Sequence, residues 1–150
     1  MHIRDRIVVI TGAASGIGKA LAQRFDQEGA RLVVSADLDG DGARATAKET
    51  GGAGFATDVS KEEDIQHLIE SVEKDHGPID LFFSNAGIGY GGGAEVSNER
   101  WDRIWDVNVM AHVWAARIWC RAWRHAAAAI CVRPLLRRDC CRRSARRPMR

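Results

Sequence analysis

Apolar positions follow a repeating pattern along the first 85 residues of the chain. Short apolar runs, such as residues 7–10 and 32–34, alternate with longer segments in which apolar residues recur at helical spacing. An unbroken apolar run predicts a strand covered on both faces, and spacings of three and four residues predict an amphipathic helix. The pattern predicts strands over residues 7–10, 31–36, 53–57 and 79–84, and helices over residues 16–29, 40–50 and 60–76.

Local signals mark the ends of these predicted helices. Gly29 suits the position just after the first helix. Ser60 and Glu63 have the spacing of a capping box, which would make Ser60 the N-cap of the third helix, and Gly77-Pro78 would end that helix. The alternation of strands and helices predicts an α/β fold with a parallel sheet and right-handed crossovers.

A glycine-rich segment lies where the first strand meets the first helix. Residues 11–18 read Thr-Gly-Ala-Ala-Ser-Gly-Ile-Gly. A turn at this junction aims the free backbone N–H groups of the helix at a phosphate. Gly12 suits the tight turn, Gly16 lets the backbone approach the anion, and Gly18 lets the helix pack close to the strand.

Two other interpretations of this segment were weighed. The loop that binds nucleoside triphosphates ends in Gly-Lys followed by Ser or Thr, but here Ala20 follows Lys19. That loop also begins with a glycine five residues before its last one, where this chain has Ala13. A structural turn that binds nothing stays open on this segment alone.

Polar side chains follow the other predicted strands. Asp37, Asp58 and Asn85 each stand at the carboxyl end of a strand, as does the glycine-rich segment. Ligands on a parallel α/β sheet bind beyond these ends. Four such positions on one edge of the sheet therefore favour a ligand site there.

Asp37 has the spacing of a ribose-binding acid. It lies 19 residues beyond Gly18, and an acid about 20 residues on accepts hydrogen bonds from the adenosine ribose in dinucleotide folds. Its charge would repel a 2′-phosphate, and Leu38 rather than arginine follows it. Asp37 therefore favours NAD over NADP, although Asp37 considered by itself is better explained as a turn residue of the polar run 37–42.

Several motifs together resemble the short-chain dehydrogenase/reductase family over about residues 4–124. Residues 11–18 match its cofactor motif, Asp58-Val59 matches its adenine-contacting pair, and residues 84–87 match its Asn-Asn-Ala-Gly motif with Ser84 in the first place. Residues 101–109 resemble the helix that carries the family's catalytic asparagine, which would be Asn108.

The resemblance implies an NAD(P)-dependent oxidoreductase that transfers hydride between the nicotinamide and an alcohol or carbonyl carbon. It also implies a Rossmann-like three-layer sandwich, which we expect to have strand order 3-2-1-4 and to be incomplete at the C-terminus. The fourth strand would be an open edge unless residues near Ile130 pair with it. The cofactor-binding residues would be Gly12, Ser15, Gly16, Ile17, Gly18, Asp37, Asp58, Val59, Asn85, Ala86 and Gly87.

The family's proton-donating machinery is absent from these 150 residues. Family members use a Tyr, a Lys four positions later and a Ser, but here the single tyrosine, Tyr90, is followed by Ala94 and the last lysine is Lys74. Only Asn108 of the four catalytic residues matches, and we expect it to act as a hydrogen-bonded polar residue inside a helix. We predict impaired catalysis; the alternatives are a non-catalytic nucleotide-binding fragment, a partner subunit, or a fragment without function.

The predicted helix over residues 97–123 carries all five tryptophans. In the family this helix forms a subunit interface, so an aromatic stripe on it predicts a homo-oligomer. Packing against the chain's own sheet explains the tryptophans equally well. His112 on the same helix is expected to be a buried or interface histidine rather than a catalytic one.

Charge divides the chain into two parts. Through Cys120 there are 12 basic and 19 acidic residues, whereas from Arg121 onward there are ten arginines and one acid, Asp139. We therefore expect a partial NAD(P)-binding domain over residues 1–124 and a basic Arg/Cys-rich tail over residues 125–150 that is mostly disordered. The sudden change of composition leads to the hypothesis of a truncated or frameshifted family member.

Composition also bears on partners and compartment. No run approaches the roughly 20 apolar residues of a membrane span, and the N-terminus lacks an apolar signal-peptide centre, so we predict a cytoplasmic protein without membrane contact. The four cysteines lack paired C-x₂-C spacing, which disfavours a metal site. The basic tail has no accompanying recognition motif, which disfavours nucleic acid.

Overall fold

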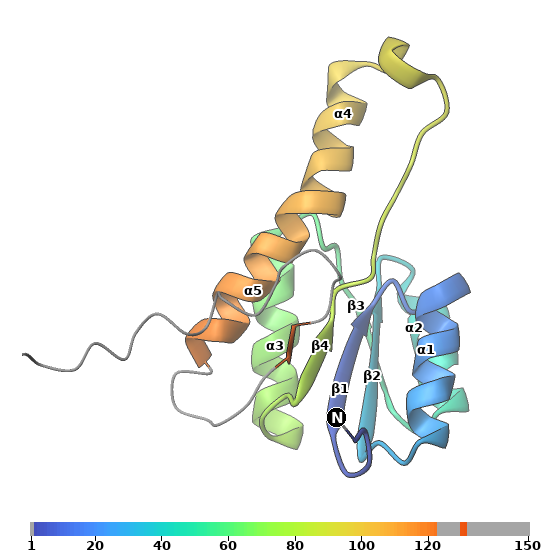
Figure 1. Ribbon diagram of the computed structural model, residues 1–150, viewed down its shortest axis with the longest axis vertical. Coiled ribbons are helices and arrows are strands. Elements are labelled where there is room, and N and C mark those ends of the chain that lie inside the picture. The colour runs from blue at the N-terminus through green and yellow to red at the C-terminus, as the bar shows by residue number, and fades with distance from the viewer. Residues whose placement is uncertain (1, 123–129, 132–150) are drawn as a thin grey trace, which may run out of the picture.

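The computed structural model describes residues 2–122 and 130–131, and it alternates strands with helices as the sequence predicts (Figure 1). The predictions for the remaining residues, including most of the 125–150 tail, lie outside the described part. The elements are β1 (Ile7–Thr11), α1 (Gly16–Gln27), β2 (Leu32–Asp37), α2 (Gly40–Glu49), β3 (Ala53–Ala56), α3 (Glu62–His76), β4 (Leu81–Phe83), η1 (Gly93–Glu95), α4 (Asn98–Trp105), η2 (Asp106–Met110), α5 (Ala111–Ala122) and β5 (Ile130–Cys131).

The described strands form one parallel sheet in the order β3-β2-β1-β4-β5. The first four confirm the predicted order 3-2-1-4. In the register of the sheet, Val8 lies between Val33 of β2 and Leu81 of β4. Ile130 pairs with Leu81, so β5 covers the edge of β4 that would otherwise be open.

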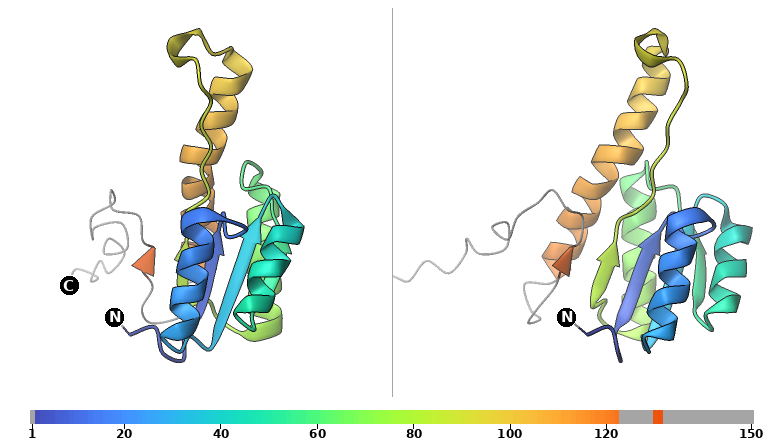
Figure 2. Two further views of the ribbon diagram at one scale, coloured as in Figure 1. Left: turned by 90° about the vertical axis from the view of Figure 1, so that its right-hand side faces the viewer. Right: turned by 45° about the vertical axis from the view of Figure 1, so that its right-hand side comes forward.

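Helices cover both faces of the sheet and complete the predicted three-layer sandwich (Figures 1 and 2). α1 and α2 lie on one face, and α3 and α5 lie on the other. Side chains of β1 alternate between the two layers: Ile7 and Val9 pack with α3 and α5, whereas Val8 and Ile10 pack with α1. All four are fully buried, which is why residues 7–10 show no polar alternation.

The predicted helix over residues 97–123 is divided by a π-helical turn, η2, between α4 and α5. α5 packs on the sheet, whereas α4 extends beyond it (Figure 1). Trp119 of α5 is 1% exposed, and its ring centroid lies 6.1 Å from that of Phe82. Trp101 and Trp105 of α4 are 48% and 58% exposed. Packing on the chain's own sheet therefore accounts for Trp119 but not for the two tryptophans of α4.

The predicted N-cap of α3 is wrong by one residue. α3 begins at Glu62 with Lys61 at the N-cap, and no side chain caps it. The Ser60 hydroxyl instead donates a 2.7 Å hydrogen bond to Oδ1 of Asp58. In a capping box the Ser60 oxygen would accept from a helix N–H, but here it accepts a 2.6 Å hydrogen bond from Nη1 of Arg103.

None of the helices within residues 2–122 combines the length and the apolar character needed to cross a bilayer.

Candidate functional site

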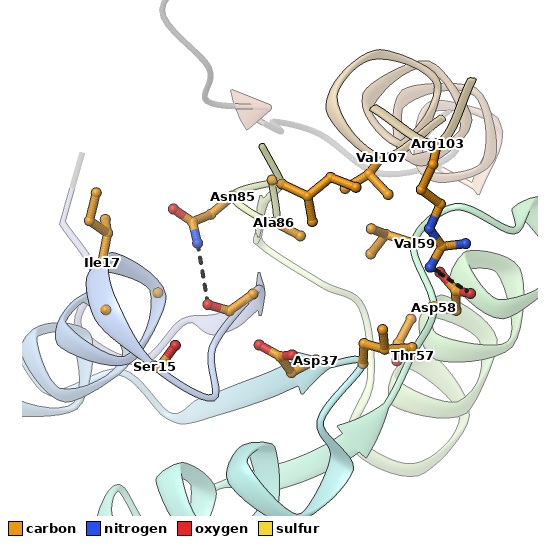
Figure 3. A pocket seen from close by; sticks show the side chains of 16 residues that line it. Ser15, Ile17, Asp37, Thr57, Asp58, Val59, Asn85, Ala86, Arg103 and Val107 are labelled. Carbon is orange, nitrogen blue, oxygen red and sulfur yellow. Dashed lines mark hydrogen bonds and ion pairs between the residues drawn. The ribbon is translucent and has the colours of Figure 1, made fainter. Parts of the chain in front are cut away.

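A cavity of about 400 Å³ opens at the carboxyl ends of β1, β2 and β4 (Figure 3). Every cofactor-binding residue predicted from the sequence lines it, although these residues come from four separate segments of the chain. The lining residues are Gly12, Ser15, Gly16, Ile17, Gly18, Asp37, Leu38, Thr57, Asp58, Val59, Asn85, Ala86, Gly87, Ile88, Arg103 and Val107.

The glycine-rich turn requires glycine at two positions for different reasons. Gly12 has a φ of +70°, and a Cβ there would lie 2.8 Å from the Cα of Ala86. A Cβ on Gly18 would lie 1.9 Å from the carbonyl oxygen of Gly12, so α1 can approach β1 this closely only without a side chain. These contacts match the turn and packing roles predicted for the two glycines.

The N-terminus of α1 points its free backbone groups into the cavity. Ser15 is the N-cap, and in the described part of the chain its side chain makes no capping hydrogen bond. The first turn of α1 carries no acidic residue, and around the Cβ position of Gly16 no described atom lies within 4 Å. The first N–H groups of an α-helix have no partner within the helix, so a helix N-terminus beside open space suits an anion.

Asp37 joins the end of β2 to the glycine-rich turn. Its Oδ2 accepts a 2.9 Å hydrogen bond from the backbone N–H of Ala14, and its Oδ1 accepts one of 3.0 Å from that of Asp39. Each carboxylate oxygen has two lone pairs, so both keep acceptor capacity toward the cavity. Asp37 also has the turn role given as the alternative, because it bonds Asp39 within the turn, whereas its ribose-binding role stays a prediction.

Thr11 and Asn85 tie the end of β1 to the end of β4. The Thr11 hydroxyl accepts hydrogen bonds from the backbone N–H groups of Asn85 and Ala86, at 3.0 and 3.2 Å. In return, Nδ2 of Asn85 donates to the carbonyl oxygen of Thr11 at 3.0 Å. It also lies 3.4 Å from the carbonyl oxygen of Gly12, the contact drawn in Figure 3. This exchange of hydrogen bonds fixes residues 85–87 against the glycine-rich turn.

Asp58 is held by an ion pair that the sequence analysis did not foresee. Nη2 of Arg103 lies 3.3 Å from both carboxylate oxygens of Asp58, and Nη1 donates to Oγ of Ser60 at 2.6 Å (Figure 3). Partial burial raises the pKa of Asp58, but hydrogen bonds from Ser60 and the charge of Arg103 outweigh that effect. The pKa of Asp58 therefore lies below its ordinary value.

Asn108 lies in η2 and holds the loop that follows β4. Its Oδ1 accepts from the backbone N–H of Ile88, and its Nδ2 donates to the carbonyl oxygen of Ile88, both at 2.9 Å. Four residues later in the chain, Nδ1 of His112 lies 2.5 Å from the hydroxyl oxygen of Ser84. Asn108 and His112 thus each bond a residue that flanks the 85–87 segment, so the helix fixes this side of the cavity.

Five lining residues were not predicted as site residues: Leu38, Thr57, Ile88, Arg103 and Val107. Three of them directly adjoin a predicted site residue in the sequence: Leu38, Thr57 and Ile88. Extending each motif by one position would have found them. Arg103 and Val107 are four residues apart on one helix face, and that spacing is the only signal in the sequence that they act together.

Comparisons with known proteins agree with this geometry. The family model described as short chain dehydrogenase matches residues 6–132. The 3beta-hydroxysteroid dehydrogenase 1 of Eggerthella lenta is 37% identical over 113 residues, covering 71% of this chain and 43% of that protein. Glucose 1-dehydrogenase 2 of Bacillus subtilis is 39% identical over 115 residues, covering 71% of this chain and 44% of that protein.

A solved structure, a metagenomic short-chain oxidoreductase in complex with NADP, is similar with a TM-score of 0.75 and 30% identity. The match covers 82% of this chain and 58% of that one. The chain thus belongs to the short-chain dehydrogenase family and has its Rossmann-like fold. It spans less than half the length of the two curated relatives named above.

Proposed function

We propose that the cavity binds a nicotinamide dinucleotide. The pyrophosphate would lie at the N-terminus of α1, the adenosine ribose at Asp37, and the adenine between Asp58 and Val59. The segment 85–87 would support the nicotinamide half. One observation carries this proposal: all predicted binding residues gather around one cavity, beside the N-terminus of α1, which within the described part of the chain has no side-chain cap.

We further propose that NAD binds better than NADP. Among the described residues that line the cavity, Arg103 is the only cation, and it is paired with Asp58. A 2′-phosphate next to Asp37 would therefore face a carboxylate without a free positive charge to offset it. Residues 11–18 contribute no basic side chain to the turn either.

Isothermal titration calorimetry with NAD, NADP and ADP-ribose tests both proposals. We expect NAD to bind at least tenfold more tightly than NADP, because one charge–charge contact contributes about 1 kcal/mol or more in a partly buried site. A Gly18→Ala variant, in which the turn cannot keep its geometry, serves as the non-binding control. Absence of binding at millimolar NAD would overturn the proposed site, and equal affinity for NADP would overturn the preference alone.

We propose that hydride transfer by this polypeptide is impaired. Its single tyrosine, Tyr90, lies on the loop after β4, is 43% exposed, and stacks under the guanidinium of Arg100 at 5.3 Å. Loss of a general acid costs about 10²–10⁴-fold in rate, and no lysine follows Tyr90 at the family spacing. NADH oxidation with a panel of ketones would contradict this proposal if turnover exceeded the background rate.

A second candidate function is a nucleotide-binding module without catalysis, such as a partner subunit. Most of the lining residues that we assign to the dinucleotide belong to the proposed pyrophosphate and adenosine positions, and only the segment 85–87 to the nicotinamide half. Equal affinity for NAD and ADP-ribose would favour this module, because the nicotinamide would then contribute nothing. Tighter binding of NAD would favour the dehydrogenase.

We also propose that the exposed aromatic face of α4 supports a homo-oligomer. Trp101 and Trp105 are one helical turn apart and both are about half exposed. Sedimentation of a Trp101→Ser/Trp105→Ser variant should show a smaller assembly than the unchanged chain, whereas Leu38→Ser, which removes an apolar side chain that is 66% exposed elsewhere on the surface, should not. A monomeric unchanged chain would contradict the proposal. The predicted cytoplasmic location stays a prediction.

A further inference from the structure

Three partners hold Asp58: one fixes its main chain, and two fix its carboxylate. The Asp58 backbone N–H donates to Oδ2 of Asp64 at 3.0 Å, which anchors the main chain. Ser60 donates to Oδ1 of Asp58 through its backbone N–H at 3.1 Å and its hydroxyl at 2.7 Å. The guanidinium of Arg103, which comes from α4, closes the arrangement by bonding Ser60 and both oxygens of Asp58.

The two carboxylate oxygens differ in the acceptor capacity they keep. Within the described part of the chain, Oδ1 accepts from the Ser60 N–H, the Ser60 hydroxyl and Arg103, whereas Oδ2 accepts from Arg103 alone. A carboxylate oxygen offers about two lone-pair sites, so Oδ1 is saturated and Oδ2 keeps one site. Asp58 lines the cavity, so this remaining site is available to a ligand.

We propose that Arg103 is a positioning residue that holds Asp58 so that the cavity selects adenine over purines with a carbonyl at position 6. The inference rests on the proposed adenine subsite. Adenine carries an amino group at position 6, a donor, where hypoxanthine carries an acceptor. A fixed, ionised Oδ2 accepts from the amine and repels the carbonyl oxygen, so discrimination depends on the carboxylate keeping this orientation.

Arg103 is suited to this role by its fork of donors. The guanidinium bonds Ser60 with one nitrogen and Asp58 with the other, so the carboxylate is prevented from rotating about its terminal bond. A lysine at this position would supply the charge without the fork. Arg103 is 37% exposed at its side chain and Asp58 14%, so the pair lies at the cavity wall rather than in the core.

The test compares the dissociation constants of NAD and nicotinamide hypoxanthine dinucleotide. The unchanged chain should prefer NAD by about tenfold or more, as expected when a hydrogen bond to a charged group is replaced by a repulsion. Arg103→Met, which keeps an apolar stem, should lower this preference by about tenfold, and Arg103→Lys should restore part of it. Arg100→Met is the matched control, because Arg100 lies three residues earlier on α4 and contacts Tyr90 instead.

Asp58→Asn provides a second variant with its own signature. An amide can donate to the hypoxanthine carbonyl, so the preference should move toward nicotinamide hypoxanthine dinucleotide. Thermal unfolding checks that each variant is folded. If Arg103→Met does not fold, Arg103→Gln is measured in its place.

The outcomes separate this inference from the proposed function. If the unchanged chain binds both dinucleotides equally, or if Arg103→Met weakens both by the same factor, the inference is overturned and the dinucleotide site stands. If the unchanged chain binds neither dinucleotide, both fail. If Arg100→Met lowers the preference for NAD as much as Arg103→Met does, the inference is also overturned. The effect would then come from the helix and not from the ion pair.

Discussion

The Asp37 carboxylate accepts a hydrogen bond from the backbone N–H of Ala14, 23 residues earlier in the chain, at 2.9 Å. The side chain at the proposed ribose position therefore also fixes the glycine-rich turn at the proposed phosphate position. The two parts of the cavity are consequently coupled through one side chain. Changes at Asp37 should alter both the stability of the turn and the choice of dinucleotide.

Replacing Asp37 by alanine should lower stability and NAD affinity together. The variant leaves the N–H groups of Ala14 and Asp39 without their acceptor, which should reduce the free energy of unfolding by about 1–3 kcal/mol. NAD should bind at least tenfold less tightly, and the NAD to NADP preference should fall because the repulsion of a 2′-phosphate is removed. Urea unfolding and calorimetry measure these changes.

Asp39→Ala is the matched control for Asp37. Oδ1 of Asp39 accepts from the backbone N–H of Gly42 at the start of α2 and does not line the cavity. Loss of this N-cap should cost about 1 kcal/mol of stability without changing NAD affinity. An equal loss of NAD affinity in Asp39→Ala would contradict the special role of Asp37.

Thr11→Val should destabilise the chain although the two side chains have almost the same shape. The Thr11 hydroxyl is the acceptor for two backbone N–H groups, those of Asn85 and Ala86, and Thr11 is 1% exposed. Two donors left unpaired in a largely buried place should cost about 2 kcal/mol or more in the free energy of unfolding. Thr11→Ser keeps the hydroxyl and should retain most of the stability; a Val variant as stable as the Ser variant would refute the prediction.

Gly18→Ala should abolish dinucleotide binding, whereas Gly89→Ala should not. A Cβ on Gly18 meets the Gly12 carbonyl at 1.9 Å, so α1 must move away from β1, at a cost of about 1–3 kcal/mol. No described atom lies within 4 Å of a Cβ on Gly89. Calorimetry with NAD and urea unfolding distinguish the two variants, and tight NAD binding by Gly18→Ala would count against the proposed position of the pyrophosphate.

Asn108→Ala should release the loop after β4. Both hydrogen bonds between Asn108 and the Ile88 backbone are lost, so the Ile88 amide should exchange its hydrogen about tenfold faster or more, equivalent to about 1.4 kcal/mol. Hydrogen–deuterium exchange read by NMR measures this rate. Asn98→Ala, at the exposed start of α4, should leave the Ile88 exchange rate unchanged; if it does not, the effect belongs to the helix as a whole.

The contribution of the Asp58–Arg103 pair to stability should depend on pH. Because the folded-state pKa of Asp58 is below its ordinary value, the unfolded chain binds more protons as the pH falls below about 4. The stabilisation is therefore present at neutral pH and is lost as the pH falls through the folded-state pKa. Urea unfolding between pH 2.5 and 7 should show that Arg103→Met costs about 1 kcal/mol at pH 7 and less at the acidic end. If the loss in the free energy of unfolding caused by Arg103→Met grew toward low pH, this prediction would be wrong.

The sheet and the outline of the cavity could be predicted because their signals are local. Residues 7–10 are buried on both faces of the sheet, so their unbroken apolar run predicts a central strand. The carboxyl ends of parallel strands meet at one edge, so Asp37, Asp58 and Asn85 could be placed together without knowing any side-chain contact.

The contacts that hold the cavity together could not be predicted. Arg103 bonds Asp58 across 45 residues, and no periodic pattern links a helix residue to a loop that far away. The capping-box spacing predicts Ser60 as a cap, but its hydroxyl donates to Asp58 and its oxygen accepts from Arg103. The residues that surround the cavity could therefore be predicted from the sequence, but not how they bond one another.

The π-helical turn η2 determines which way the tryptophans face. Trp101 and Trp119 are 18 residues apart, which in an uninterrupted α-helix is about five full turns and would put both side chains on the same side. The wider turn at residues 106–110 changes that phase, and α4 in addition continues past the edge of the sheet. One end of a single rod can therefore seal the protein interior while the other end presents indole rings to solvent. Winding the wide turn as ordinary α-helix, with no residue deleted, would turn both rings to the same side and set these two tasks against each other.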